Sequence, residues 1–378
     1  MARKFATRVT NIEISGIRRA FEASTGEFFN LGLGEPDFDT PEHIKRAAMQ
    51  AIESGFTSYT VNKGIAELRE AISAKFNRDN HFSVGPEEII VTSGASEALH
   101  IALQSVVERG DEVLLPNPGF VSFAALTKLA EGIPVGVPLG EDFTMSVEAV
   151  KERITNKTRA LILNSPANPT GAVEGERNVK ALVDIAADHQ LTIISDEVYE
   201  QLIYDDLQHV SPARFYDSVI TVNAVSKTYA MTGFRLGYLA APAANVEQMV
   251  KIHQYIQACA SSISQKAALA ALTGPQDCVA EMRREFKRRR DFAVAALREL
   301  GMDFRTPQGA FYIFPRVTDE QEFVEALRKQ KIIVTPGSAF GSLGKQHVRI
   351  SYATRFENLE RAFAIMKDVV TGGERTGR

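Results

Sequence analysis

The sequence predicts an α/β protein built on a mostly parallel β-sheet. After about residue 86, short apolar runs alternate with longer helical patterns, which is typical of parallel strands joined by crossover helices. The chain has 378 residues, of which 44% are hydrophobic and 24% charged. This ordinary composition allows a sizeable core, and the length favours about two domains.

The expected strands of the main sheet occupy residues 88–92, 112–116, 159–164, 192–196, 219–223 and 237–241. Further along, a long helix over about 279–300 precedes the runs AFYIFP, KIIVT and VRISYA and a closing helix, which together predict a smaller α/β unit. The first forty residues have few helix signals and are expected to pack against it. We therefore expect a large domain over residues 41–285 and a small, discontinuous domain over residues 1–40 and 286–378.

Charge and cysteine content exclude several classes of function. The net charge of −4 gives no electrostatic footprint for nucleic acid or an anionic membrane. The basic run at 287–290 lies among acidic residues and is interpreted as a solvated helix face. Two cysteines, Cys259 and Cys278, support neither a disulfide framework nor a metal site. Without a targeting segment or membrane span, we expect a cytoplasmic protein with no nucleic-acid, membrane or metal partner.

Informative residues follow the predicted strands, where open parallel sheets bind their ligands. Gly94, Ala95 and Ser96 open a helical pattern, where backbone N–H groups attract an anion; a plain strand-to-helix turn is the alternative. Phe120 follows the next strand and is either the wall of a site or core. Asn168 lies in the tight turn SPANPTG, with a purely structural role as the alternative.

Three charged residues complete this edge of the sheet. Asp196 ends a buried strand and must meet a cation or a strong donor, because an unpaired buried carboxylate is costly. Lys227, beside Ser226, is the residue type that forms Schiff bases with carbonyl compounds, and Arg235 is suited to phosphate. Pyridoxal 5′-phosphate (PLP) needs an amine for its aldehyde, a carboxylate for its ring nitrogen and donors for its phosphate. Together these residues predict a PLP site.

The chain resembles, over nearly its whole length, the class I/II aminotransferases of PLP fold type I. The resemblance rests on motifs that occur in the family's order: LGLGEPDFDTP, YTVNKGIAELREAI, VTSGASEAL, PNPGF, NSPANPTGAV, SDEVYE, VSKTYAMTGFRLGY, GAFYIFP, PGSAFG and VRISYAT. It implies a large domain with a mostly parallel seven-stranded sheet and a smaller α/β domain. It also implies ping-pong transamination between an amino acid and a 2-oxo acid, through Schiff-base PLP and pyridoxamine phosphate.

The resemblance also implies a role for each cofactor-binding residue. Lys227 corresponds to the Schiff-base lysine that later shuttles a proton, and Asp196 to the partner of the pyridinium nitrogen. Asn168 and Tyr199 correspond to the donors to the phenolic oxygen, and Phe120 to the ring stacked on the pyridine. The phosphate is expected to contact Gly94, Ala95, Ser96, Ser226, Arg235 and, from the partner subunit of a homodimer, Tyr59.

The substrate side is less sharply defined by the resemblance. Arg349 corresponds to the arginine that binds the α-carboxylate, and Gly34 to a glycine whose backbone contacts the same group. The segments that line the side-chain pocket contain Ile14, Ser15, Gly16, Tyr312, Ser338 and Phe340. Arg18 and Arg19 either supply a switchable positive charge or are solvated helix residues.

For substrates, the resemblance implies aromatic, broad-specificity or aspartate donors, with 2-oxoglutarate as the expected acceptor and a place in amino acid metabolism or biosynthesis. A carbon–sulfur lyase or related lyase on the same fold is the alternative, because it shares the cofactor residues. A nicotinamide dehydrogenase is not expected, since no GxGxxG turn lies in the required context.

Overall fold

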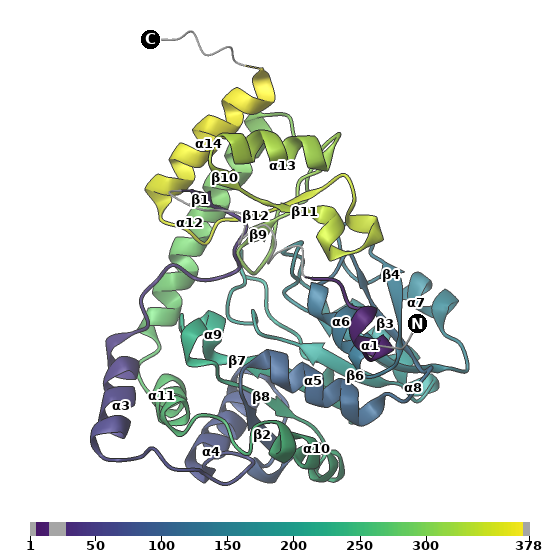
Figure 1. The fold of residues 1–378 in the computed structure, drawn as a ribbon, viewed down its shortest axis with the longest axis vertical. Helices are drawn as coiled ribbons and strands as arrows, with labels where there is room; N and C mark the ends of the chain where they lie inside the picture. The colour runs from purple at the N-terminus through teal and green to yellow at the C-terminus, as the bar shows by residue number, and fades with distance from the viewer. Residues whose placement is uncertain (1–4, 15–27, 373–378) are drawn as a thin grey trace.

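The computed structural model describes residues 5–14 and 28–372, and its larger part is a seven-stranded sheet between helices (Figure 1). The strand order is β2-β8-β7-β6-β5-β3-β4, and β8 runs antiparallel to both of its neighbours while the other pairings are parallel. This confirms the predicted α/β class. The strands are β2 (Ile89–Thr92), β3 (Glu112–Asn117), β4 (Ile133–Pro138), β5 (Thr158–Asn164), β6 (Thr192–Asp196), β7 (Val219–Ala224) and β8 (Gly237–Ala240).

The edge strand β4 is absent from the strands expected in the sequence. Its segment reads IPVGVP, in which Pro134, Gly136 and Pro138 interrupt the apolar pattern. An edge position tolerates prolines because only one side of the strand takes part in the ladder. Sequence periodicity alone therefore misses this strand.

Both faces of the sheet are buried. In β5, Ala160 and Ile162 belong to one hydrophobic cluster and Leu161 and Leu163 to another, because successive side chains of a strand point to opposite faces. The first cluster includes residues of α5 (Ala95–Val106), α6 (Val121–Leu129) and α10 (Ala243–Ile256), and the second residues of α7 (Val147–Arg153) and α8 (Glu176–Asp188). This double covering explains why the strands read as nearly continuous apolar runs.

Other helices cover the β2–β8 end of the sheet, where α11 (Ser262–Thr273) packs against α3 (Glu42–Glu53) and α4 (Ala66–Lys75). Ser261 caps α11 by accepting the N–H of Ser264. Short helical segments complete this part of the chain: η1 (Phe76–Asn80), η2 (Pro86–Glu88), η3 (Pro212–Arg214), α9 (Val225–Thr228) and η4 (Thr232–Phe234).

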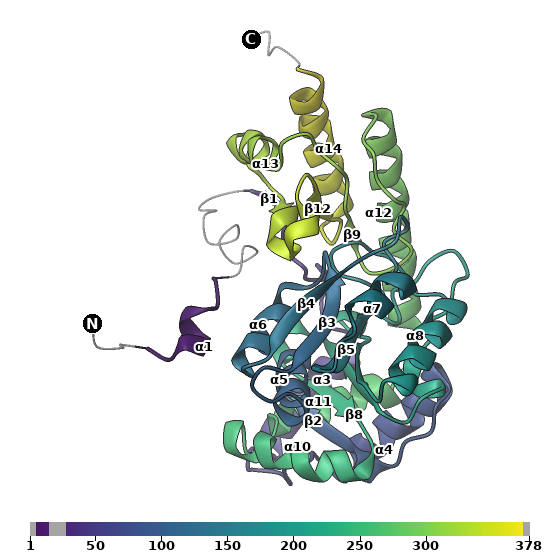
Figure 2. The ribbon, with the colours of Figure 1, turned by 90° about the vertical axis from the view of Figure 1, so that its right-hand side faces the viewer.

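The smaller α/β unit lies above the main sheet in Figures 1 and 2. The long helix α12 (Asp277–Glu299) extends into it and packs against α14 (Phe356–Thr371). Its strands form an antiparallel sheet of order β11-β12-β9 and a parallel pair of β1 with β10. The remaining elements are β1 (Phe29–Asn30), β9 (Tyr312–Ile313), α13 (Glu320–Lys329), β10 (Ile332–Ile333), β11 (Thr335–Pro336), η5 (Gly337–Phe340), η6 (Ser342–Gly344) and β12 (Val348–Ser351).

Two further segments bear on the sequence predictions. The short helix α1 (Thr7–Thr10) lies beside α6, which covers the main sheet, so the expectation that the first forty residues pack against the smaller unit is wrong for this helix. Lys128 of α6 donates to the carbonyl oxygen of Asn11 at 3.3 Å. The interpretation of 287–290 as a solvated face is wrong for half of the run, because Arg289 and Arg290 are buried and paired with Asp37 and Asp205. These acids come from distant segments, and helix periodicity does not reveal their contacts with the helix.

No helix in the described part of the chain is long and apolar enough to cross a membrane.

Candidate active site

A cavity of about 320 Å³ lies where the carboxyl ends of the main-sheet strands meet the smaller unit. It is lined by most of the residues that the sequence predicted for cofactor and substrate: Gly34, Gly94, Ala95, Ser96, Phe120, Asn168, Asp196, Tyr199, Ser226, Lys227, Arg235, Tyr312 and Arg349. These residues come from segments more than 300 positions apart along the chain. The structure therefore brings the predicted residues together at one place.

One wall of the cavity is a cradle suited to an anion. Gly94, with a φ of +83°, directly precedes α5, and a Cβ atom there would lie 2.8 Å from Nη2 of Arg235. Ala95 and Ser96 are the first residues of α5, whose N–H groups have no acceptor within a helix. Helix N-terminus and guanidinium thus face the same space, which fits a phosphate group.

Lys227 lies in α9, beyond the end of β7, and its Nζ donates to the carbonyl oxygen of Gly34 at 2.7 Å. Burial of the amine, aided by the positive charges of Arg235 and Arg349, lowers the pKa of Lys227 to about 8, although Glu35 and Asp196 act in the opposite direction. A sizeable fraction of this lysine is therefore the neutral, nucleophilic amine near physiological pH.

Asp196 is the last residue of β6 and is 4% exposed. Its Oδ1 accepts the N–H of Val198 at 3.3 Å, and no cationic side chain of the described residues forms an ion pair with it. Burial, with a contribution from the neighbouring Glu197, raises the pKa of Asp196 to about 7. This carboxyl group is suited to a cationic partner inside the cavity, which the protonated ring nitrogen of PLP provides.

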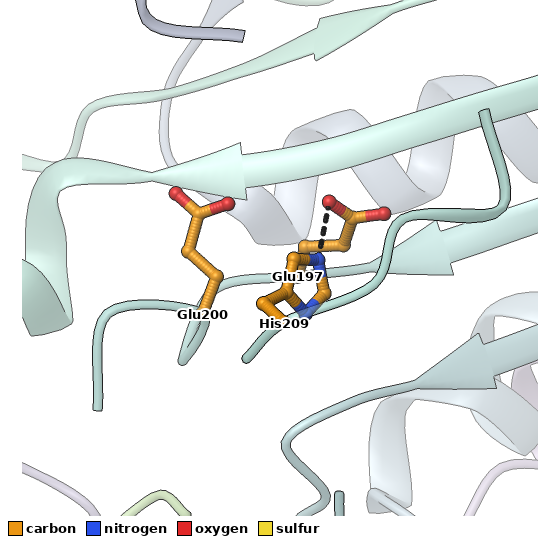
Figure 3. Close-up of side chains that lie close together, drawn as sticks. All are labelled: Glu197, Glu200 and His209. Atoms are coloured by element: carbon orange, nitrogen blue, oxygen red, sulfur yellow. Dashed lines mark hydrogen bonds and ion pairs between the residues drawn. The ribbon is translucent and has the colours of Figure 1, made fainter. Parts of the chain in front are cut away.

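Glu197, the residue after Asp196, belongs to a group of buried polar side chains with Glu200 and His209 (Figure 3). Glu197 is fully buried and accepts hydrogen bonds from Ser195 and Ser211, while its Oε2 lies 2.8 Å from Nε2 of His209. Although burial opposes ionisation, His209 and the two hydroxyls lower the pKa of Glu197. Glu200 is ion-paired with Lys75. Glu197, Glu200 and His209 are close enough to hold a metal ion, but Glu197 is paired with His209 and Glu200 with Lys75.

At the other end of the cavity, Arg349 on β12 is 1% exposed and has no carboxylate partner among the described residues. Its Nη1 donates to Oδ1 of Asn168 at 2.8 Å and its Nη2 to the carbonyl oxygen of Gly32 at 2.6 Å, while Nε has no acceptor. Burial lowers the pKa of Arg349. Because an uncompensated buried cation is costly, this guanidinium is a receptor for an anion.

Aromatic rings surround this guanidinium. Its Cζ lies 4.4 Å from the ring centroid of Tyr312 and 4.8 Å from that of Phe340. The hydroxyl groups of Tyr199 and Tyr312 are 2.7 Å apart. Gly34 must be glycine, because a Cβ atom there would lie 2.2 Å from the hydroxyl oxygen of Tyr312. The Gly34 backbone can therefore approach Tyr312 this closely only because glycine has no side chain.

The cavity is also lined by residues that were not predicted from the sequence: Leu33, Glu35, Leu99, Asn164, Val198 and Thr232. Asn164 accepts the N–H of Asn168 at 2.9 Å and donates to the carbonyl oxygen of Asp196 at 3.2 Å. It therefore orients the turn that carries Asn168. It ends β5, so the rule that singled out Asp196, a polar residue at a strand end, would also have found Asn164.

Four of the predicted residues that the structure describes do not line this cavity. Tyr59 is 88% exposed on the segment between α3 and α4. Phe340 is buried and lines a larger neighbouring cavity of about 1250 Å³, together with Ile14 and Ser338. The remaining predicted pocket residues, Ser15, Gly16, Arg18 and Arg19, lie outside the described residues.

A seven-stranded, mostly parallel sheet with a lysine, a carboxyl group and an anion cradle at one edge defines an enzyme of the PLP-dependent fold type I class. Residues 26–365 match the family Aminotransferase class I and II, and the chain belongs to this family. It is therefore an aminotransferase that uses PLP to transfer an amino group between an amino acid and a 2-oxo acid. This finding favours transamination over the lyase alternative.

Similar proteins carry names of the same kind. The chain is 48% identical over 373 residues to the probable aspartate aminotransferase of Methanocaldococcus jannaschii, covering 96% of this chain and 99% of that protein. It is 44% identical to aromatic-amino-acid aminotransferase 2 of Thermococcus litoralis, covering 96% and 97% of the two chains. Aspartate aminotransferase from Thermus thermophilus with maleate superposes with a TM-score of 0.93 at 38% identity, covering 97% and 100%.

Proposed function

We propose that this aminotransferase accepts aromatic amino acids or a broad range of amino donors, aspartate included, and uses 2-oxoglutarate as acceptor. The observation that carries the proposal is Arg349, a buried cation with an unpartnered Nε at the end of the cavity opposite the anion cradle. A planar guanidinium is matched to a carboxylate, which amino acids and 2-oxo acids share. Both half-reactions can therefore use the same contact.

At the cofactor end, Lys227 would hold the aldehyde of PLP, Asp196 its ring nitrogen and Phe120 its ring. When bound, PLP supplies an electron sink for the charge that develops on the substrate Cα. With PLP bound, Lys227 Nζ would serve as the group that takes a proton from the substrate Cα, a role that a pKa of about 8 favours. The phosphate and phenolic oxygen are held by Gly94, Ala95, Ser96, Ser226, Arg235, Asn168 and Tyr199.

At the substrate end, Arg349 binds the α-carboxylate and the Gly34 backbone contacts the same group. Asn168 links the two ends, because its Oδ1 accepts from Arg349 and its amide nitrogen remains a donor for the cofactor. Tyr312 supplies aromatic surface at this end, and Phe340, which lines the neighbouring cavity, packs against the guanidinium that binds the substrate.

The charges around the cavity bear on donor choice. The cationic side chains of the described residues that line it are Lys227, Arg235 and Arg349. If these serve the aldehyde, the phosphate and the α-carboxylate, none is left for a side-chain carboxylate. Aromatic donors therefore fit the lining at least as well as aspartate does, and Arg18 and Arg19 are the candidates for an additional cation.

We also infer that the enzyme acts in the cytoplasm, in amino acid biosynthesis, as a homodimer in which Tyr59 contacts the partner's cofactor phosphate. Tyr59 and Tyr255 are 88% and 87% exposed, and Val61 and Ile256, within two positions of them in the sequence, are 62% and 46% exposed. The two segments are joined by a hydrogen bond of 2.6 Å from Asn62 to the carbonyl oxygen of Ala258. Such exposed apolar surface is typical of an interface.

The division into a cofactor-binding domain over 41–285 and a small domain over 1–40 and 286–378 is part of the same proposal. It is supported by a hydrophobic cluster that joins Leu31 to residues of α12, α13 and α14. The helix α12 runs without a break across residue 286, so the two domains share this helix.

Steady-state kinetics with 2-oxoglutarate and a panel of donors test the proposal. We expect phenylalanine and tyrosine to give kcat/KM values at least equal to that of aspartate, with glutamate formed in each case. A protein that transaminates none of these donors would contradict the assignment of Arg349 and Lys227. A strong preference for aspartate would contradict the charge argument and point to Arg18 or Arg19.

A further inference from the structure

A second ionisable pair, Glu97 and His253, lies behind the anion cradle and outside the cavity. Glu97 is the third residue of α5 and is 9% exposed, and one of its carboxylate oxygens accepts the N–H of Ser93. It thus holds the residue that directly precedes the Gly94 turn. His253, on α10, is fully buried, and its Nδ1 lies 2.8 Å from the other oxygen of Glu97.

The second ring nitrogen of His253 fixes the protonation of the pair. Nε2 lies 2.9 Å from the carbonyl oxygen of Asn62, which can only accept, so Nε2 must carry a proton. Nδ1 faces a carboxylate, which also accepts unless it is protonated. Glu97 already accepts the Ser93 N–H through its other oxygen, as a carboxylate does best. The contacts are all satisfied when both ring nitrogens carry protons and Glu97 is ionised.

The same pair connects two segments with separate tasks in the proposed function. On one side, Glu97 holds the turn assigned to the cofactor phosphate of this subunit. On the other side, His253 holds Asn62, three residues after Tyr59, which is assigned to the phosphate of the partner subunit. A further contact, from Gln257 to the hydroxyl of Ser93 at 3.3 Å, joins the end of α10 to the turn. The backbone at both phosphate contacts therefore depends on one buried pair.

We propose that Glu97 and His253 form a buried carboxylate–imidazolium pair that positions the phosphate-binding turn and ties it to the segment that carries Tyr59. The pair touches neither cofactor nor substrate, so both are positioning residues. The positive charge of His253 also offsets the negative charge that Glu97 places at the helix N-terminus, where an uncompensated carboxylate would repel a phosphate. The inference rests on the proposed assignment of the phosphate to residues 94–96.

The substitution Glu97→Gln provides a nearly isosteric test of the charge state. Its amide oxygen can still accept from Ser93, and its NH₂ can donate to an unprotonated Nδ1, so every contact is kept with a neutral His253. In ¹⁵N-labelled holoenzyme at neutral pH, we expect both ring nitrogens of His253 to be protonated in the native enzyme and only Nε2 in Glu97→Gln. A His253→Gln variant assigns the signal. A neutral His253 in the native enzyme would overturn the proposal.

Positioning is tested through the dissociation constant of PLP, measured by equilibrium dialysis on the cofactor-free protein. We expect Glu97→Gln to stay within about threefold of the native value and Glu97→Ala to bind about tenfold more weakly or worse, because the turn loses a buried hydrogen bond. Glu174→Ala is the matched control. Glu174 is also buried and accepts a backbone N–H, that of Met145 at 2.7 Å, but on the other face of the sheet.

The outcomes separate the two proposals. If Glu97→Ala and Glu174→Ala lower the thermal midpoint alike and leave the PLP dissociation constant unchanged, Glu97 is merely structural and the inference is wrong. If Arg235→Ala binds PLP as tightly as the native enzyme, the phosphate assignment itself fails, and the inference fails with it. If Arg235→Ala and Glu97→Ala both bind PLP more weakly, and Glu174→Ala binds it as the native enzyme does, the phosphate assignment and the positioning role of the pair are both supported.

Discussion

The two ends of the cavity differ in the charged groups that they hold. The cofactor end holds Lys227 and Asp196, whose pKa values of about 8 and about 7 lie within reach of physiological pH. The substrate end holds Arg349, which stays charged over the whole functional range and is fixed by Asn168 and Gly32. One end is therefore arranged to exchange protons, whereas the other only holds an anion in place. Substitutions at the first should therefore act on kcat, and those at the second on KM.

The largest expected effect follows from Lys227→Ala. Removing the amine abolishes both the covalent link to the cofactor and the proton carrier, so we expect kcat to fall by about a thousandfold or more. The circular dichroism spectrum should stay that of the native protein, because the variant removes a side chain that faces a cavity. Residual transamination above a few per cent would show that another residue serves as the amine.

Asp196→Asn is expected to have the next largest effect. The amide cannot stabilise a protonated ring nitrogen as a carboxylate does, so kcat should fall by about 100-fold, while KM for the amino donor changes by less than about threefold. Steady-state kinetics at saturating PLP measure both constants. A rise in KM as large as the fall in kcat would mean that the two ends of the cavity do not have separate roles.

Arg349→Lys tests the substrate end. A lysine keeps the charge but cannot form two parallel hydrogen bonds to a carboxylate, so we expect KM for amino acid and 2-oxo acid to rise by about tenfold or more with a smaller change in kcat. The effect should be shared by all donors, because each carries the α-carboxylate. An unchanged KM would place the carboxylate site elsewhere in the cavity.

The smallest effect concerns the coupling between the two ends. Because the pKa of Lys227 is lowered to about 8, its amine gains reactivity as the pH rises through 8 and levels off at higher pH. The rate at which the cofactor-free protein captures PLP, followed by stopped-flow absorbance, should show this midpoint. Arg349 lowers the pKa of Lys227, so Arg349→Gln should move the midpoint to higher pH. Asp196 raises that pKa, so Asp196→Asn should move it to lower pH. An Arg349→Gln profile identical to that of the native protein would show that the charges at the two ends do not interact, and the Asp196→Asn profile shows the shift expected from a charge at the same end.

The comparison also explains how far the sequence could predict the site. Residues of the cofactor end directly follow strands of one parallel sheet, so the strand-end rule singled out Asp196, Lys227 and the Gly94 turn without further knowledge. Arg349 lies within a strand of a different sheet and reaches the cavity beside Gly32 and Tyr312. No local sequence pattern predicts that Arg349 reaches the cavity beside these residues, and only the resemblance to a family indicated it.

Other features depended on long-range contacts that periodicity does not encode. The edge strand β4 contains prolines that a sequence pattern interprets as breakers, although an edge accommodates them. Arg289 and Arg290 looked like surface charges, because their partners Asp37 and Asp205 lie far away along the chain. Glu97 lies in the GASEA segment, which the sequence singled out. Its partner His253 is 156 positions away along the chain, so the sequence does not reveal the pair.

The visible absorbance of the purified protein, titrated with aspartate, glutamate, phenylalanine, tyrosine and alanine, tests the central claim most directly. The claim is that Lys227 holds PLP at one end of a cavity whose other end binds the α-carboxylate. We expect a yellow protein whose visible band disappears on addition of a suitable amino acid and returns on addition of a 2-oxo acid. A protein that stays colourless after addition of PLP would contradict the cofactor site and every role assigned around it.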